Sequence, residues 1–256
     1  MKTTSAVTKP RSLKTLIRVF ICLLILVIIG FSIALNSFEK GQFTCNKYTL
    51  NTYLYIILTF NLIALYCLSL EHLNIEYKLN LLMLIGIFII TIALLISLNF
   101  IDPRKIIFKH LVWLVFVLGL SFIFYPMFHS FTDKTVVISA AFTTILLTIG
   151  LSIIAYVKPE WINLSIGPVL FILLLGGIIM EITLLIIYRK DYRKINNLFR
   201  FMCYFFIAVF MGYILYDTKM LQIRAKECVK ADYIQESLNL FLDIFNIFVR
   251  ILALGR

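Results

Sequence analysis

The sequence predicts an all-α membrane protein, a polytopic bundle of eight hydrophobic helices. Hydrophobic residues make up 62% of the chain and charged residues only 14%, whereas a soluble domain is about half apolar and about a quarter charged. Eight apolar runs come near the ~20 residues that a membrane helix needs. The connectors between them are too short to hold a soluble domain, so we expect a single membrane domain.

The eight runs follow one another along the whole chain. The first seven carry few or no charges, and the eighth is the least hydrophobic. Charged turns separate several of them, at 102–105, 158–160 and 189–194. The longest connector, Asp217–Gln235, is polar and is read as a loop. The runs are Leu16–Leu35, Tyr53–Leu70, Leu79–Phe100, Ile106–Tyr125, Thr135–Val157, Leu164–Tyr188, Leu198–Tyr216 and Glu236–Leu254.

The first run follows a basic segment, KPRSLKTLIR, as a signal peptide would. Its apolar stretch is too long for the 7–15 residues typical of a signal peptide core, so a retained span is favoured over a cleaved one. The predicted organisation is a basic tail over 1–15, an extra hydrophobic helix over 16–36, and a transmembrane domain over 53–256.

The net charge of +11 does not indicate nucleic-acid binding. The basic residues lie between hydrophobic runs, where they flank membrane spans and contact anionic headgroups, and no basic patch is interleaved with exposed aromatics. If all eight runs span, eleven basic residues fall on one face and nine on the other. The positive-inside rule therefore assigns no orientation.

The five cysteines are scattered and show no CxxC spacing. This pattern predicts neither a disulfide framework nor a zinc site. Cys22, Cys67 and Cys203 lie inside apolar runs, as packing residues do. Cys45 and Cys228 lie in predicted loops, and their spacing leaves open whether they pair.

The last run carries a stripe of polar residues with Asp243 at its centre. The stripe residues are separated by four, three, four, three and four positions, which places them on one helical face. The opposite face is apolar, so the helix can line water on one side. The alternative is an interfacial helix lying flat on the membrane. The stripe consists of Asp232, Glu236, Asn239, Asp243, Asn246 and Arg250.

A second carboxylate, Asp217, closes the seventh run. If the connector folds back, Asp217 and Asp243 lie on adjacent antiparallel helices and can meet. Two neighbouring carboxylates do not both ionise readily, so such a pair would share a proton and act as a pH-sensitive latch. Once deprotonated, it would offer hard oxygen ligands to a passing cation such as Ca²⁺.

Other polar residues inside the runs are candidates for lining a pore, because a charge at the bilayer centre costs roughly 2.5–3.5 kcal/mol and usually faces the bundle interior. Glu181 lies within the sixth run. Asp232, Glu236, Asn239 and Asn246 share the face of Asp243. Lys109 opens the fourth run, and we expect its long side chain to reach the membrane interface.

The C-terminal segments YDTKM and DYIQESLNLFLDIFNIFVRIL are similar to the signature of the Bax-inhibitor/lifeguard family. The chain matches the family's aromatic-Asp-Thr element, with Lys219 in place of the usual Gln, and its Asp-Tyr-Ile and Leu-Phe-Leu-Asp elements. Upstream, YLYIILTFNLIAL and HLVWLVFVLGLSF resemble earlier family helices. The resemblance covers residues from about Tyr53 to Arg256 and implies seven family helices preceded by the extra one.

The resemblance implies a protein of internal membranes, in the endoplasmic reticulum or Golgi or else at the plasma membrane, that leaks Ca²⁺ in a pH-dependent way and so suppresses cell death. Asp217 and Asp243 would be the gate and a transient Ca²⁺ site. Protons, Ca²⁺ and lipid would be the partners, with no resident cofactor. The basic residue that pairs with these aspartates in some relatives is missing, and Lys78, Lys109 or Arg250 would replace it.

Two other functions remain as alternatives to a channel. The first is a non-conducting protein that binds other membrane proteins and alters their fate, which the extra first helix favours. The second is an intramembrane aspartyl protease, because Tyr216-Asp217 resembles the Tyr-Asp element of those enzymes. Their Gly-x-Gly-Asp element is absent, since this chain has Leu240-Phe-Leu-Asp243. We therefore expect no enzymatic activity.

Overall fold

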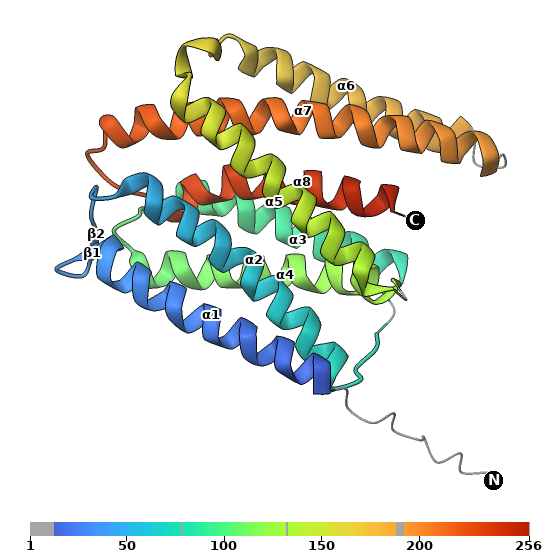
Figure 1. Ribbon diagram of the computed structural model, residues 1–256, viewed down its shortest axis with the longest axis horizontal. Helices are drawn as coiled ribbons and strands as arrows, with labels where there is room; N and C mark the ends of the chain where they lie inside the picture. The colour runs from blue at the N-terminus through green and yellow to red at the C-terminus, as the bar shows by residue number, and fades with distance from the viewer. Residues whose placement is uncertain (1–12, 78, 132, 188–191, 256) are drawn as a thin grey trace. The chain divides into compact units, whose positions relative to one another are not determined.

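A computed structural model describes residues 13–77, 79–131, 133–187 and 192–255 (Figure 1). These residues form eight long helices, each long and apolar enough to cross a membrane. A two-stranded hairpin, β1 (Phe38–Glu39) and β2 (Gln42–Phe43), follows the first helix, and a 3₁₀ turn, η1 (Pro159–Trp161), follows the fifth. The helices are α1 (Leu13–Ser37), α2 (Tyr48–His72), α3 (Leu81–Phe100), α4 (Ile106–His129), α5 (Lys134–Val157), α6 (Ile166–Ile187), α7 (Tyr192–Lys226) and α8 (Tyr233–Leu254).

The all-α membrane fold predicted from the apolar runs is confirmed, and polar side chains mark where several helices begin. Asn80 accepts a hydrogen bond from the Met83 amide at the start of α3. Asp133 and Asp232 cap α5 and α8 in the same way. Capping side chains satisfy amides that have no partner within the helix, so these connectors end in well-defined helix starts.

The seventh helix is longer than its apolar run. We expected the helix to end at Tyr216 and a loop to begin at Asp217, but α7 continues to Lys226. The extension, DTKMLQIRAK, is polar yet consists mostly of residues that favour a helix. Asp217 therefore lies inside a helix, more than two turns before its end, and the connector to α8 is only six residues long.

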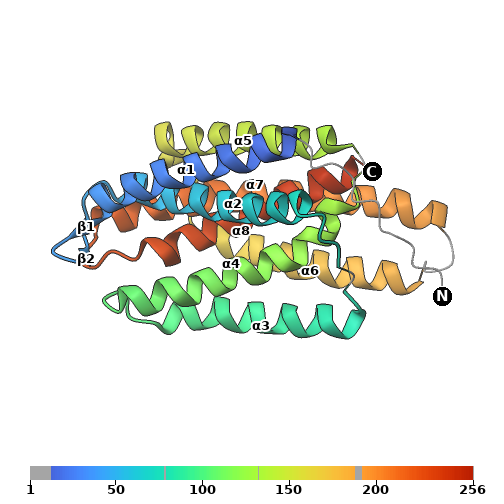
Figure 2. The ribbon, with the colours of Figure 1, turned by 90° about the horizontal axis from the view of Figure 1, so that it is seen from below.

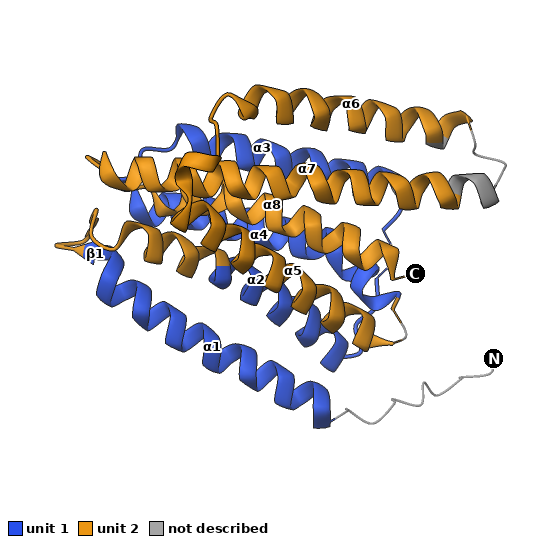
Figure 3. Cartoon of the chain, turned by 45° about the horizontal axis from the view of Figure 1, so that its top comes forward, with its two compact units in different colours: residues 1–38, 57–130 blue, residues 39–56, 131–256 orange. Residues whose placement is uncertain are grey.

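The described residues divide into two compact units (Figure 3). Unit 1 comprises residues up to 38 and residues 57–130, and unit 2 comprises residues 39–56 and 131–256. In unit 1, α3 packs against α4, and the two run side by side in Figure 2. The Asn61 amide donates to the Cys22 carbonyl and joins α2 to α1. Tyr77 and Tyr125 hydroxyls donate to the carbonyls of Phe122 and Ile75.

In unit 2, α7 packs against α5, α6 and α8, and α5 also packs against α8. Figure 1 shows α6 and α7 side by side along most of their length. The core of this unit is α8, which buries apolar residues such as Ile234, Leu238, Phe241 and Ile247. The last run is therefore a packed helix of unit 2, which contradicts the alternative of a helix lying outside the bundle.

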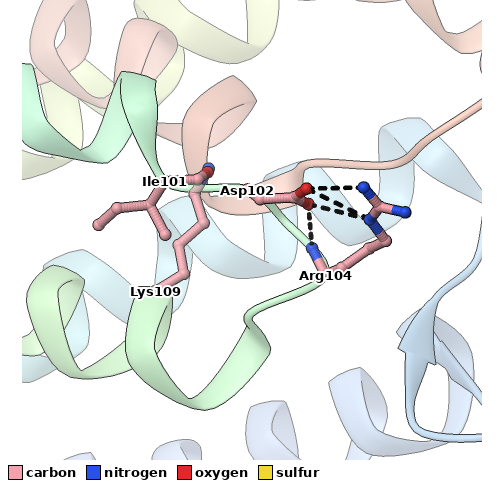
Figure 4. A network of polar contacts seen from close by, with 4 residues as sticks. All are labelled: Ile101, Asp102, Arg104 and Lys109. Atoms are coloured by element: carbon pink, nitrogen blue, oxygen red, sulfur yellow. Dashed lines mark hydrogen bonds and ion pairs between the residues drawn. The ribbon is translucent and has the colours of Figure 1, made fainter.

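Lys109 differs from the sequence-based expectation of a side chain at the membrane interface. It is fully buried in unit 1. Its ammonium group donates a hydrogen bond of 3.0 Å to the carbonyl of Ile101, just after the last turn of α3 (Figure 4). A buried amine requires hydrogen-bond acceptors, and carbonyls near a helix C-terminus are available because they lack partners within the helix.

Candidate functional site

The candidate site lies where α7 and α8 pack as antiparallel neighbours in unit 2. The carboxyl groups of Asp217 on α7 and Asp243 on α8 are hydrogen-bonded to each other. An ionised carboxylate only accepts hydrogen bonds, so this contact requires a proton on one of the two groups. The structure thus brings together the two residues that the sequence singled out, in a geometry suited to a shared proton.

Asp243 is the buried member of the carboxyl pair. Asp243 is only 6% exposed, and among the described residues its Oδ2 atom has no hydrogen-bond partner. The local sequence explains this placement, because the residues flanking Asp243 on α8 are buried and apolar, among them Leu240, Phe241 and Ile244. Packing these neighbours turns Asp243 inward toward α7.

A second polar contact between the same two helices lies nearer to their connector. The Arg224 guanidinium donates to both carboxylate oxygens of Glu236, each at 2.9 Å. Sequence reasoning missed Arg224 because it placed this residue in a loop. The signal was present in the spacing, since Arg224 follows Asp217 by seven positions, as Asp243 follows Glu236, and a separation of seven returns to the same helical face.

A pocket lies between these two polar contacts. It is too narrow to admit a water molecule. Of the carboxyl pair, Asp217 lines this closed pocket. The pocket is lined by Asp217, Leu221, Arg224, Glu236, Asn239 and Leu240.

The remaining residues of the predicted polar stripe have local roles. Asp232 caps α8 by accepting from the Gln235 amide. The Asn246 side chain donates to the Leu242 carbonyl one turn earlier on the same helix. Asn239 lines the pocket. Of the stripe, Glu236, Asn239 and Asp243 therefore belong to the site, while Asp232 and Asn246 serve the helix itself.

Glu181 and Arg250 pair with each other. The Arg250 guanidinium donates to both Glu181 carboxylate oxygens, at 2.6 and 2.8 Å. It also lies over the Phe206 ring, 4.2 Å from its centroid. Arg250 is therefore the counter-charge of Glu181, whereas we expected it to serve Asp217 and Asp243, and the carboxylate of Glu181 is neutralised rather than open to a pore.

Of the other two expected counter-charges, the structure describes one. Lys109 is buried in unit 1, with its ammonium on the Ile101 carbonyl. Lys78 lies outside the residues that the structure describes. The basic group in the surroundings of Asp217 is instead Arg224, whose positive charge acts on this carboxyl together with the negative charge of Glu236.

A disulfide closes the end of unit 2 where α7 and α8 connect. Cys45, ahead of α2, is bonded to Cys228, in the α7–α8 connector, with Cα atoms 5.9 Å apart. The Tyr233 hydroxyl donates to the Thr44 carbonyl beside it. Sequence spacing left this pairing open, because the two cysteines are separated by 183 positions.

The fold and site together define a multi-pass membrane protein with a carboxyl pair between its last two helices. A family model described as "Inhibitor of apoptosis-promoting Bax1" matches residues 45–254. The match covers most of the chain, and the protein belongs to the Bax inhibitor family, as the C-terminal signature predicted. The matched segment begins after α1. Searches of curated proteins and of solved structures find no significant match.

Proposed function

We propose that this protein is a pH-sensitive cation leak channel in which Asp217 and Asp243 form the gate. The observation that carries the proposal is the hydrogen bond between these two carboxyl groups, beside a pocket too narrow for water that Asp217 lines. Family membership supports it as well. The channel would release Ca²⁺ from an intracellular store, such as the endoplasmic reticulum or Golgi, and blunt cell-death signalling by lowering the store.

The gate follows from the charge of the pair. With one proton shared, the carboxyl groups attract each other and hold α7 against α8. When the pH rises and the proton leaves, two carboxylates about 4 Å apart repel by about 4 kcal/mol at an effective dielectric constant of 20. This repulsion is large enough to separate the helices, and the exposed oxygens then suit Ca²⁺, a hard cation. Flux should therefore rise as the pH rises.

Ca²⁺ flux from liposomes containing the full-length protein tests the gate. Asp243→Asn should reduce flux at high pH to nearly the protein-free level and remove its pH response. The reason is that an asparagine amide can donate to the Asp217 carboxylate at any pH, so the latch stays closed. Asp102→Asn is a matched control, because Asp102 lies in an exposed turn, and we expect normal flux from it.

Two results would contradict the proposal. The first is an Asp243→Asn protein with the same flux and pH response as the original chain. The second is an original chain that conducts no Ca²⁺ at any pH. The second result would favour a non-conducting protein that acts through other membrane proteins, and both aspartates could then be replaced by asparagine without loss of the cellular effect.

A further inference from the structure

The contacts between α7 and α8 form a short ladder with the carboxyl pair at its inner end. Asp217 faces Asp243, and seven positions away Arg224 faces Glu236. Seven residues of helix correspond to about 10 Å along the axis. Leu221 and Leu240 line the pocket between these two contacts. The ladder thus runs from the acid pair, of which Asp243 is buried, past two leucines, to an ion pair near the α7–α8 connector.

The ion pair lies nearer to the α7–α8 connector than the carboxyl pair does, and its arginine reaches the surface. The Arg224 side chain is 43% exposed, while that of Glu236 is only 12% exposed, so Arg224 covers its partner from outside. One guanidinium nitrogen of Arg224, Nη1, donates to both oxygens of Glu236. Since Asp217 and Arg224 line the same narrow pocket, the entrance to Asp217 from this end passes the ion pair.

The end of unit 2 that contains this entrance also holds the disulfide. Cys45–Cys228 joins the connector before α2 to the connector between α7 and α8. Hydrogen bonds from Tyr156 to Thr49 and from Gln222 to the Ala155 carbonyl bring the last turns of α5 and α7 to the same end. The entrance and the disulfide therefore face the same side of the membrane.

A disulfide indicates which side this is. Disulfides form and persist in organelle lumens and outside cells, and are rare in the cytosol. The count of spans agrees with the bond, because eight crossings place the first and seventh connectors on one face. The disulfide therefore assigns the orientation that the nearly equal numbers of basic residues on the two faces left open.

We propose that the Asp217–Asp243 pair is reached from the oxidising side of the membrane, through an entrance that the Arg224–Glu236 ion pair closes. The proposal names the side of the membrane and the two residues that close the entrance. It rests on the proposed function only for the identity of the ion that passes. It predicts that lumenal or external protons, not cytosolic ones, set the state of the carboxyl pair. Arg224 and Glu236 thus act as positioning residues, outside the carboxyl pair itself.

The orientation can be measured with single cysteines at the two ends of α5 in the full chain. Ser130→Cys precedes this helix and Glu160→Cys follows it; both positions are exposed. A membrane-impermeant maleimide is added to sealed microsomes, whose cytosolic face points outward. Ser130→Cys should be labelled at once, and Glu160→Cys only after the vesicles are opened. The reverse order would overturn the proposal, and so would full labelling of Cys45 and Cys228 without a reductant.

The entrance can be measured with cysteines at Asp217 and at Asn239, two positions that line the pocket. In sealed microsomes an impermeant reagent should not label Asp217→Cys. In vesicles opened by freeze–thaw it should label slowly, and adding Arg224→Ala should raise the rate by about tenfold. Asn239→Cys provides a second reading if Asp217→Cys does not fold. Lys158→Ala is the matched control, since Lys158 is a half-exposed partner of Glu160 at the same end of unit 2.

Labelling of either pocket cysteine in sealed vesicles would overturn the proposal, and so would an unchanged rate with Arg224→Ala. Exchanging the two charges, Arg224→Glu with Glu236→Arg, should restore slow labelling, which loss of packing alone would not do. None of these rates requires ion flux. A protein that labels as expected but conducts no Ca²⁺ would therefore contradict the proposed function and support the entrance.

Discussion

The acidic residues of unit 2 differ in what neutralises them. Glu181 has an ion pair with Arg250, and Glu236 has one with Arg224. Asp217 and Asp243 are hydrogen-bonded to each other through a proton, and the positive charge of Arg224 also acts on Asp217. A proton, unlike a guanidinium, is a counter-charge that solution pH can remove. The carboxyl pair is therefore the contact among these three that we expect to respond to pH.

The Glu181–Arg250 pair should be a structural contact whose loss is costly. Both side chains are 18% exposed, and removing one partner of a buried ion pair costs about 3–5 kcal/mol, because the other charge is left unpaired. Glu181→Leu should lower the apparent Tm in detergent markedly. Glu181→Leu with Arg250→Leu should recover much of the loss, as the unpaired charge is gone.

An exposed pair provides the comparison for this thermal measurement. Arg104 and Asp102 lie 3.0 Å apart, with Arg104 73% exposed (Figure 4), and an exposed pair contributes only about 0–1 kcal/mol. Asp102→Leu should therefore change Tm far less than Glu181→Leu does. Equal effects of the two substitutions, or a double variant less stable than Glu181→Leu alone, would contradict the structural role of Glu181.

Sequence reasoning identified the carboxyl pair but not the partners of the other charges. Asp243 and Asp217 could be predicted because helical periodicity singles out Asp243 and because consecutive spans joined by one connector run antiparallel. Glu181 and Arg250 could not be matched, since they are 69 positions apart and lie on α6 and α8. Nothing in either local pattern states which helices are neighbours, and that arrangement follows only from packing.

At the scale of the element, hydropathy predicted each of the eight long helices in the described part of the chain, and its largest boundary error is at the end of the seventh. The apolar run of the seventh helix ends at Tyr216, but α7 continues through ten polar and mixed residues to Lys226. Hydropathy measures the preference for lipid, whereas helix formation depends on backbone propensity. The two criteria diverge where a helix leaves the apolar region, and there Arg224 was missed.

The start of α5 depends on a single charged cap. Asp133 accepts hydrogen bonds from the amide and hydroxyl of Thr135. The Thr135 side chain, and then its backbone amide, hold the pKa of Asp133 below its usual value of 3.8. A lowered pKa means that the carboxylate stabilises the folded state above pH 3.8, and that this contribution is lost as the pH falls through the lowered pKa.

Amide exchange in the first turn of α5 should therefore accelerate below pH 3.8, beyond the intrinsic change of exchange with pH. Asp133→Asn keeps a capping oxygen without a titrating group, so its exchange in this turn should lack the extra acid-dependent increase. The first turn of α3, capped by Asn80, serves as the internal reference. If Asp133→Asn shows the same acid-dependent increase as the original chain, the cap does not depend on charge.

At the scale of the whole molecule, the number of spans was readable from the sequence and the closure of unit 2 was not. Eight apolar runs give eight helices. No local sequence pattern predicts the disulfide between the segment before α2 and the α7–α8 connector. Which cysteines pair depends on which connectors lie together after folding. The disulfide adds two kinds of information, a covalent link between distant segments and the side of the membrane on which they lie.

Loss of the disulfide should destabilise the end of unit 2 that carries the entrance. Cys228→Ser should lower stability by about 2–4 kcal/mol, the usual range for a disulfide, which corresponds to roughly 4–16 °C in Tm for a domain of this size. Added reductant should reproduce the shift in the original chain and have no effect on Cys228→Ser. Cys22→Ser, which removes a free thiol from α1, should leave both Tm and the response to reductant unchanged. A Tm that neither Cys228→Ser nor reductant alters would show that the aromatic contacts of Tyr233 with Phe43 and Tyr48 hold this end together without the bond.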